Sequence, residues 1–136
     1  MGSVPSIDTS LHNIFKSWYL FRKGKKIHRD IDIFSYYLDK NLYQLWLDIK
    51  TGAYRHGIYR SLIVTDNKRR EISVAPIRDR VVHRLLYEYL VPIYDKKFIF
   101  DAWSCRKHKG LLKAIIRTQK LLLGYHRSWV WRADIQ

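Results

Sequence analysis

The strongest constraint on the fold is a change in the spacing of the apolar residues near Gly52. Between Asp30 and Gly52 the apolar residues recur every three or four positions, as on one face of an amphipathic helix. Beyond it, Ile58–Val64 and Arg70–Ala75 are strand-like, and the polar stretch 65–68 between them is typical of a turn. We therefore expect a helix followed by a β-hairpin, with Asp30 as the N-cap of the helix and Gly52 as its end.

The remainder of the chain is mainly helical in pattern. Pro76 ends the second strand, and Pro92 is expected to close the next helix, because proline lacks an N–H and clashes with the preceding turn. The class is therefore α+β. The other expected elements are helices at Leu11–Phe21, Arg78–Val91 and Leu111–Leu123, the last ended by Gly124, and a strand at Ser128–Ala133, buried by its tryptophans, that leads to Asp134.

Charge is the clearest guide to partners. The chain has 136 residues, enough for one domain, and 47% of them are hydrophobic, so a packed core is expected. Lys and Arg number 26 against 12 Asp and Glu, which gives a formal net charge of +14. Such a surplus favours nucleic acid first and an anionic membrane surface second, although it also fits a merely soluble basic surface. The basic run Arg22–Arg29 is either a solvated linker or a nucleic-acid contact.

The sequence also excludes several classes of protein. A single cysteine, Cys105, rules out an internal disulfide framework and fits a reducing cytoplasm, and we expect it to be a packed thiol. No apolar run is long enough for a membrane span or a signal peptide. The six histidines include no pair at i, i+4 spacing of the metal-ligand type, so each is expected to be structural or exposed.

Four features stand in a fixed order along the chain. They are a basic hairpin tip, an Arg78-Asp79-Arg80 helix start, the basic loop Ser104–Gly110 and a hydrophobic strand that ends in Asp134. Each feature alone is weak. Arg78 and Arg80, for example, could simply pair with Asp79 at a helix N-terminus, where an acid is favourable.

Taken together, these features resemble the bacterial reverse transcriptases, the group that contains group II intron maturases, retrons and diversity-generating retroelements. The resemblance covers Tyr54–Gln136. Its first motif corresponds to Lys68–Ile72 and Ala75–His83, its second to Phe98, Ala102–Arg106 and Gly110, and its third to Trp129–Ile135.

The resemblance implies a right-hand polymerase, an RNA-directed DNA polymerase that uses Mg²⁺, an RNA template, a DNA primer and deoxynucleoside triphosphates. Residues 1–29 would form an N-terminal helix and basic linker, 30–127 the fingers, and 128–136 the first strand of the palm. The implied site residues are Lys68, Arg69 and Arg70 for the incoming nucleotide, Arg106, Lys107 and Lys109 for the template, and Asp134 as catalytic, metal-binding carboxylate.

The sequence departs from this family in one respect. It holds no adjacent Asp-Asp pair, and it ends two residues after Asp134. Because one carboxylate cannot hold two metal ions, the expectation is a fragment that binds nucleic acid or nucleotide but is catalytically inactive, with no Mg²⁺ bound. Two alternatives remain: a stand-alone RNA-binding module without polymerase ancestry, and an interaction domain that self-associates through exposed apolar surface.

Overall fold

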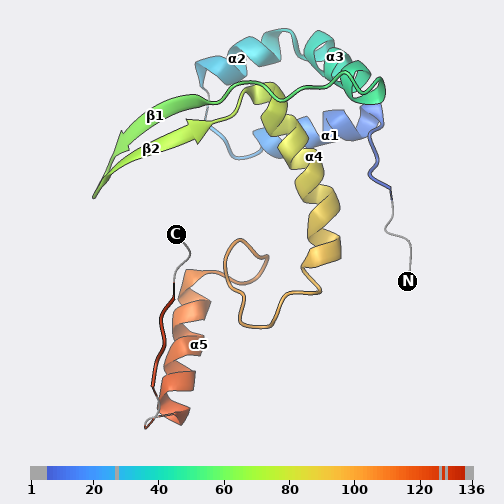
Figure 1. The fold of residues 1–136 in the computed structure, drawn as a ribbon. Coiled ribbons are helices and arrows are strands. Elements are labelled where there is room, and N and C mark those ends of the chain that lie inside the picture. The colour runs from blue at the N-terminus through green and yellow to red at the C-terminus, as the bar shows by residue number, and fades with distance from the viewer. Residues whose placement is uncertain (1–5, 27, 126, 128, 134–136) are drawn as a thin grey trace. The chain divides into compact units, whose positions relative to one another are not determined.

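A computed structural model describes residues 6–26, 28–125, 127 and 129–133 of the chain (Figure 1). These residues form an α+β structure of five helices and one antiparallel hairpin, which confirms the expected class. Two compact units divide the chain, residues 1–92 and residues 93–136. The expected polymerase boundaries at 29/30 and 127/128 stay a prediction. The elements are α1 (Leu11–Arg22), α2 (Arg29–Tyr36), α3 (Leu38–Lys50), β1 (Arg60–Thr65), β2 (Arg69–Val74), α4 (Ile77–Tyr94) and α5 (Leu111–Gly124).

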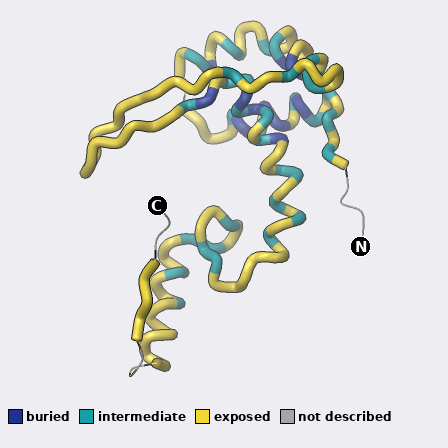
Figure 2. Tube along the Cα trace, viewed as in Figure 1, coloured by how far each residue is buried: buried dark blue, intermediate teal, exposed yellow. Residues whose placement is uncertain are grey.

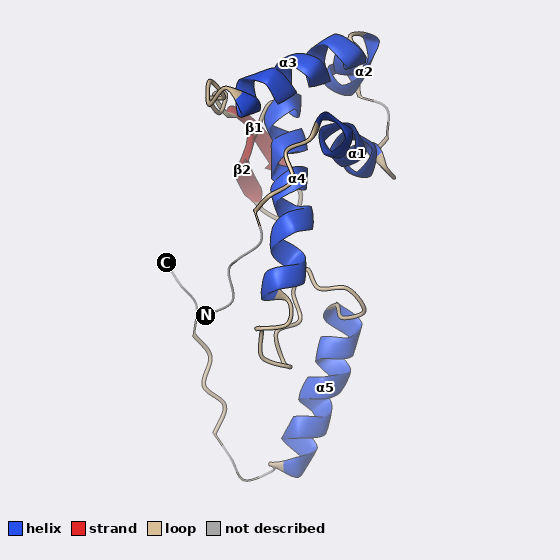
Figure 3. Ribbon diagram, turned by 90° about the vertical axis from the view of Figure 1, so that its right-hand side faces the viewer, coloured by secondary structure: helices blue, strands red, loops and turns tan. Residues whose placement is uncertain are grey.

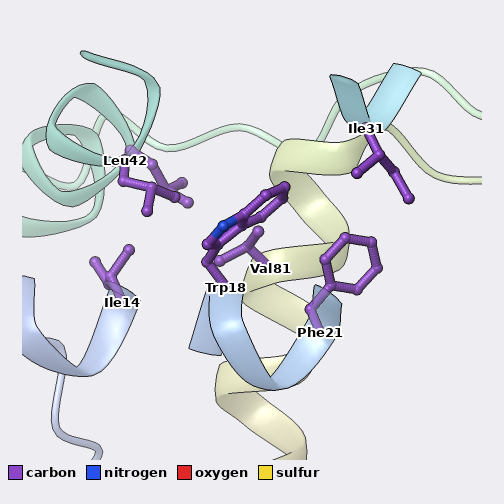
Figure 4. Packing of buried hydrophobic residues seen from close by; sticks show 7 residues of the cluster. Ile14, Trp18, Phe21, Ile31, Leu42 and Val81 are labelled. Carbon is purple, nitrogen blue, oxygen red and sulfur yellow. The ribbon is translucent and has the colours of Figure 1, made fainter. Parts of the chain in front are cut away.

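The first unit is held together by one apolar core that its helices share. Trp18 on α1 is 3% exposed and stacks on Phe34 of α2, with ring centres 5.0 Å apart. The buried cluster also contains Leu42 and Leu45 of α3 and Val81 of α4, at 0–1% exposure. These positions follow the three- and four-residue spacing of the sequence, so each helix presents one apolar stripe to the others (Figure 4).

The single helix expected between Asp30 and Gly52 is two helices, α2 and α3, broken at Tyr37. The backbone of Tyr37 leaves the helical region, at φ −110° and ψ 35°, and the Asn41 side-chain amide donates to the Phe34 carbonyl at 3.0 Å. That hydrogen bond satisfies a carbonyl near the break. A continuous apolar period does not reveal such a local cap.

The structure contradicts the expected start of this helical region and agrees with its expected end. The N-cap of α2 is His28, whose Nδ1 accepts from the Asp30 amide, so the prediction of Asp30 as N-cap is wrong. Asp30 lies instead in the first turn, where its negative charge favours the helix dipole. At the other end α3 stops at Lys50, and Gly52 follows with a φ of +72°, which suits glycine.

The hairpin forms as predicted. Strands β1 and β2 pair in antiparallel register from Arg60 with Val74 to Thr65 with Arg69, and residues 66–68 make the turn. Its residues are exposed except for Val74, as the yellow hairpin in Figure 2 shows. A two-stranded hairpin is only marginally stable by itself, so its order depends on how its base is attached.

Helix α4 begins directly after Pro76 but does not stop at Pro92, which lies inside it. The prediction that Pro92 closes the helix is therefore wrong. Proline fits helical φ and removes only one hydrogen bond, and here just two residues follow it before the helix ends. The end of α5 at Gly124 was predicted correctly.

The second unit has few buried side chains. It consists of α5 and the loops around it (Figure 3), and none of the residues of α5 is buried. Cys105 is exposed, so the expectation of a packed thiol is wrong; its loop has no core to enter. None of the helices in the described ranges is long and apolar enough to cross a membrane.

The strand expected at 128–133 is not formed by the described residues 129–133. A strand needs a hydrogen-bonded neighbour, and the sheet of the described residues contains β1 and β2 alone. Trp129 and Trp131 are exposed rather than buried. Asp134, at the end of the expected strand, lies outside the described residues.

The shared core predicts a large cost for truncating Leu42, which is fully buried. Leu42→Ala should lower the free energy of unfolding by about 2–5 kcal/mol, because it removes buried methyl groups and leaves a cavity. Leu47→Ala, on the same helix but 36% exposed, is the matched control and should cost less than about 1 kcal/mol. Urea denaturation followed by circular dichroism measures both; equal losses would contradict this assignment of the core.

Candidate nucleic-acid interface

The register of the hairpin sorts its side chains onto two faces. Successive residues of a strand point to opposite faces, whereas directly paired residues share a face. Val64 pairs with Arg70, and Leu62 pairs with Ile72. Arg70 therefore stands near the tip of an exposed apolar face made by Leu62, Val64 and Ile72.

The three cations expected to act together, Lys68, Arg69 and Arg70, do not share that face. Arg69 pairs with Thr65 and lies on the opposite face with Glu71, while Lys68 belongs to the turn. All three cations are exposed, and within the described part of the chain their side chains make no ion pair. Their role in binding a triphosphate stays a prediction, and the register favours Arg70 over Arg69.

A cavity of about 530 Å³ lies at the base of the hairpin, between α2 and the start of α4. Its size is within the range of small-molecule sites, and much of its wall is apolar. The same face of the hairpin that carries Arg70 reaches this cavity through Val74 and Arg60. Its lining includes Phe34, Tyr37, Val74, Arg60, Arg78 and Arg80.

The arginines of this cavity differ in how far their charge is neutralised. Arg60 donates to Asp30 at 2.5 Å, and this hydrogen bond lowers the pKa of the Asp30 carboxyl below its ordinary value. Arg78 pairs with Asp48. Arg80 makes no ion pair within the described residues, so its charge stays uncompensated there.

Asp79 is the most buried charged group of the described residues, at 1% exposure. Its carboxylate accepts hydrogen bonds from the Tyr54 hydroxyl at 2.6 Å and from the Gly57 amide at 3.0 Å. The expectation that Arg78 and Arg80 pair with Asp79 is therefore wrong. The acid instead bonds backwards along the chain, to the segment that leads into the hairpin.

Gly57 is required by this arrangement. A Cβ at residue 57 would lie 2.9 Å from Pro76 Cγ and 3.0 Å from the Asp79 carboxylate. The chain entering β1 thus passes directly against the residue that precedes α4. Together, Gly57 and Asp79 fix the base of the hairpin to the start of α4.

In the second unit, Arg106 organises its own loop. Its guanidinium donates to the Asp95 side chain at 2.7 Å and backbone at 2.9 Å, and also to the carbonyls of Ile99 and Ala102. These bonds occupy most of its donors. Template binding by Arg106 stays a prediction, but the geometry favours a positioning role for this residue.

The two lysines beside it are placed differently. Lys107 is exposed. The Lys109 ammonium donates to the Phe100 carbonyl and lies 4.1 Å from the centre of the Phe100 ring and 4.5 Å from that of Trp103. Of the expected template-binding residues, Lys107 is the one whose charge is most open to a ligand.

The described residues do not build a metal centre. No three or more of their His, Cys, Asp and Glu side chains gather so as to hold an ion. The Mg²⁺ expectation depends on Asp134, which is outside the described ranges, and it stays a prediction.

No protein-family model matches the chain, and a search of curated proteins finds no match either. The assignment of a function therefore depends on the residues themselves. Sequence reasoning missed the cavity at the hairpin base, because Arg60 and Asp30 stand 30 positions apart and no local pattern links them.

The buried carboxylate predicts a specific cost for Tyr54→Phe. This change leaves one Asp79 oxygen without its donor, and hydrogen bonds to charged groups contribute about 1.5–3 kcal/mol, so the free energy of unfolding should fall by roughly that amount. Tyr59→Phe, at an exposed tyrosine nearby, is the control and should change little. Chemical denaturation at neutral pH distinguishes the two variants. An unchanged free energy of unfolding for Tyr54→Phe would contradict the structural role of this hydrogen bond.

Tyr54 also predicts a loss of stability at alkaline pH. Burial and the hydrogen bond to Asp79 raise the pKa of the Tyr54 hydroxyl well above its ordinary value. The folded state thus holds this proton more tightly than the unfolded chain, so the stabilisation is complete below about pH 10 and declines as the pH rises further. The stability difference between wild type and Tyr54→Phe should shrink above that pH. Denaturation at several pH values measures it, and a difference that grew with pH would contradict the assignment.

Proposed function

We propose that this chain is the fingers region of an RNA-directed DNA polymerase, binding template–primer and the incoming deoxynucleoside triphosphate. The observation that carries the proposal is the shared face of the hairpin. Arg70 stands near its tip, and Arg60, Arg78 and Arg80 line the cavity at its base. Between them lies the exposed apolar strip of Leu62, Val64 and Ile72.

This arrangement suits a ligand that is apolar at one end and strongly anionic at the other. A nucleotide offers a flat base and a charged phosphate chain, and guanidinium groups bind phosphate through paired hydrogen bonds. Arg60 and Arg78 are neutralised by Asp30 and Asp48. Arg70 and Arg80 therefore supply the free positive charge of this surface.

The hairpin also has the freedom that a nucleotide-binding element requires. Its residues beyond the base are exposed, and its attachment depends on the contacts of Gly57 and Asp79. A hairpin held only at its base can close on a bound triphosphate, which would bring guanidinium charge to the phosphates as negative charge shifts during nucleotidyl transfer. The transfer itself needs metal-binding carboxylates, of which Asp134 is the proposed first.

Arg70→Ala tests the proposal, and Arg69→Ala is its matched control: the same residue type, on the same strand, facing the opposite way. Losing a hydrogen bond to a charged group, about 1.5–3 kcal/mol, corresponds to at least about a tenfold weaker affinity for a deoxynucleoside triphosphate. Arg69→Ala should change that affinity by less than about threefold, and both variants should melt as the wild type does. Fluorescence titration with a labelled triphosphate measures the affinities.

Equal affinities for Arg70→Ala and wild type would remove the nucleotide role of the hairpin. If the chain binds RNA but no triphosphate, the result would favour the stand-alone RNA-binding module instead. The polymerase assignment itself is tested by primer extension. The polypeptide used joins this chain to a palm segment that carries the adjacent Asp-Asp pair of the polymerase family. There, Arg70→Ala should slow incorporation by about 100-fold or more.

A further inference from the structure

A second basic surface lies on the first unit, away from the hairpin strands. It is a groove of about 380 Å³ between the C-terminal end of α1 and the middle of α4, called here the α1–α4 groove. None of the described residues that line it is Asp or Glu. Its lining includes Lys23, Lys25, Arg80, His83, Arg84 and Tyr87.

The charges of this groove are only partly neutralised from within. Arg84 donates through Nη2 to Glu88 at 2.5 Å, while its Nε is buried with no hydrogen-bond partner among the described residues. Lys25 and Arg80 lie 5.0 and 4.9 Å from the centre of the Phe21 ring, and neither has a carboxylate partner in the described ranges. Lys25 and Arg80 therefore share one aromatic ring, and no acid of the described residues pairs with either of them.

Such a gathering of like charges is unfavourable unless an anion joins it. The basic run at 22–26 continues the same charge beyond the groove with Arg22 and Lys26. Tyr87 adds a partly exposed aromatic ring, at 37% exposure, on which a base can stack. Cationic side chains that follow a groove, next to an exposed ring, are the combination that single-stranded nucleic acid requires.

We propose that the α1–α4 groove binds the phosphodiester backbone of a single-stranded RNA or DNA segment. Arg80 lines both this groove and the cavity at the hairpin base. One strand can therefore run along the groove and approach the hairpin without a break in positive charge. The inference needs the chain to bind nucleic acid but does not need it to be a polymerase.

The test is a double variant, Lys23→Ala/Lys25→Ala, in the full chain. Both lysines are exposed, so the fold should be retained, as thermal melting will verify. The control is Lys16→Ala/Lys40→Ala, two exposed lysines outside the groove lining. Each double variant lowers the formal net charge from +14 to +12, so a difference between them reports position rather than total charge.

Binding of a fluorescent oligouridylate is measured by anisotropy between about 50 and 200 mM salt. The groove variant should bind at least about tenfold more weakly at the lower salt, and its slope of log affinity against log salt should fall by about 1.4, or about 0.7 for each lost phosphate contact on a single strand. The control should stay within about threefold of the wild type.

Two further outcomes separate this inference from its rivals. The affinity of the groove variant for a free deoxynucleoside triphosphate should be unchanged; a loss of triphosphate affinity with normal oligouridylate binding would make the groove a mononucleotide site and overturn the proposal. Equal oligouridylate affinities for the groove and control variants would also overturn it. Equal oligouridylate affinities would leave the hairpin proposal standing, because Arg70 lies outside the groove lining.

Discussion

The attachment of the hairpin to the first unit depends on one buried carboxylate. The Asp79 carboxylate accepts hydrogen bonds from the Tyr54 hydroxyl and the Gly57 amide. Asp79 also lies in the first turn of α4, where the helix dipole favours a negative charge. These contacts join the segment entering the hairpin to the helix that leaves it. Together with the Arg60–Asp30 ion pair they fix the direction of the exposed hairpin, whose own strands bury almost nothing. Ile58 and Pro76, which flank this junction, line the cavity at the hairpin base.

Charge compensation then decides which cations remain open to a ligand. Arg60, Arg78 and Arg106 each pair with an aspartate and so hold segments of the chain together. The cations of the hairpin tip and of the α1–α4 groove lack such partners among the described residues, apart from the Arg84–Glu88 pair. The basic residues are thus divided between structural ion pairs and cations without such partners, and the proposed phosphate contacts fall on the second group.

Local sequence rules located most elements and failed where a tertiary contact or a single cap decided the outcome. The hairpin and its turn follow from strand-like runs around a polar stretch. The break at Tyr37 depends on the Asn41 side chain, which an apolar period does not report. Pro92 stays in its helix because only one hydrogen bond is lost near the end. The segment 129–133 has strand-like residues but no neighbouring strand in the described ranges to pair with.

The sequence by itself determined the α+β class, the core faces of the helices of the first unit, the hairpin and the basic character of the surface, because periodicity and composition are local or summed properties. Tertiary structure alone decided that Asp79 bonds to Tyr54 and Gly57 rather than to its neighbours, and that Arg70 is paired with Val64. It also brought the end of α1 beside α4 to form the groove. Each of these features depends on contacts between residues far apart in sequence or on strand register. Local sequence patterns report neither kind of information.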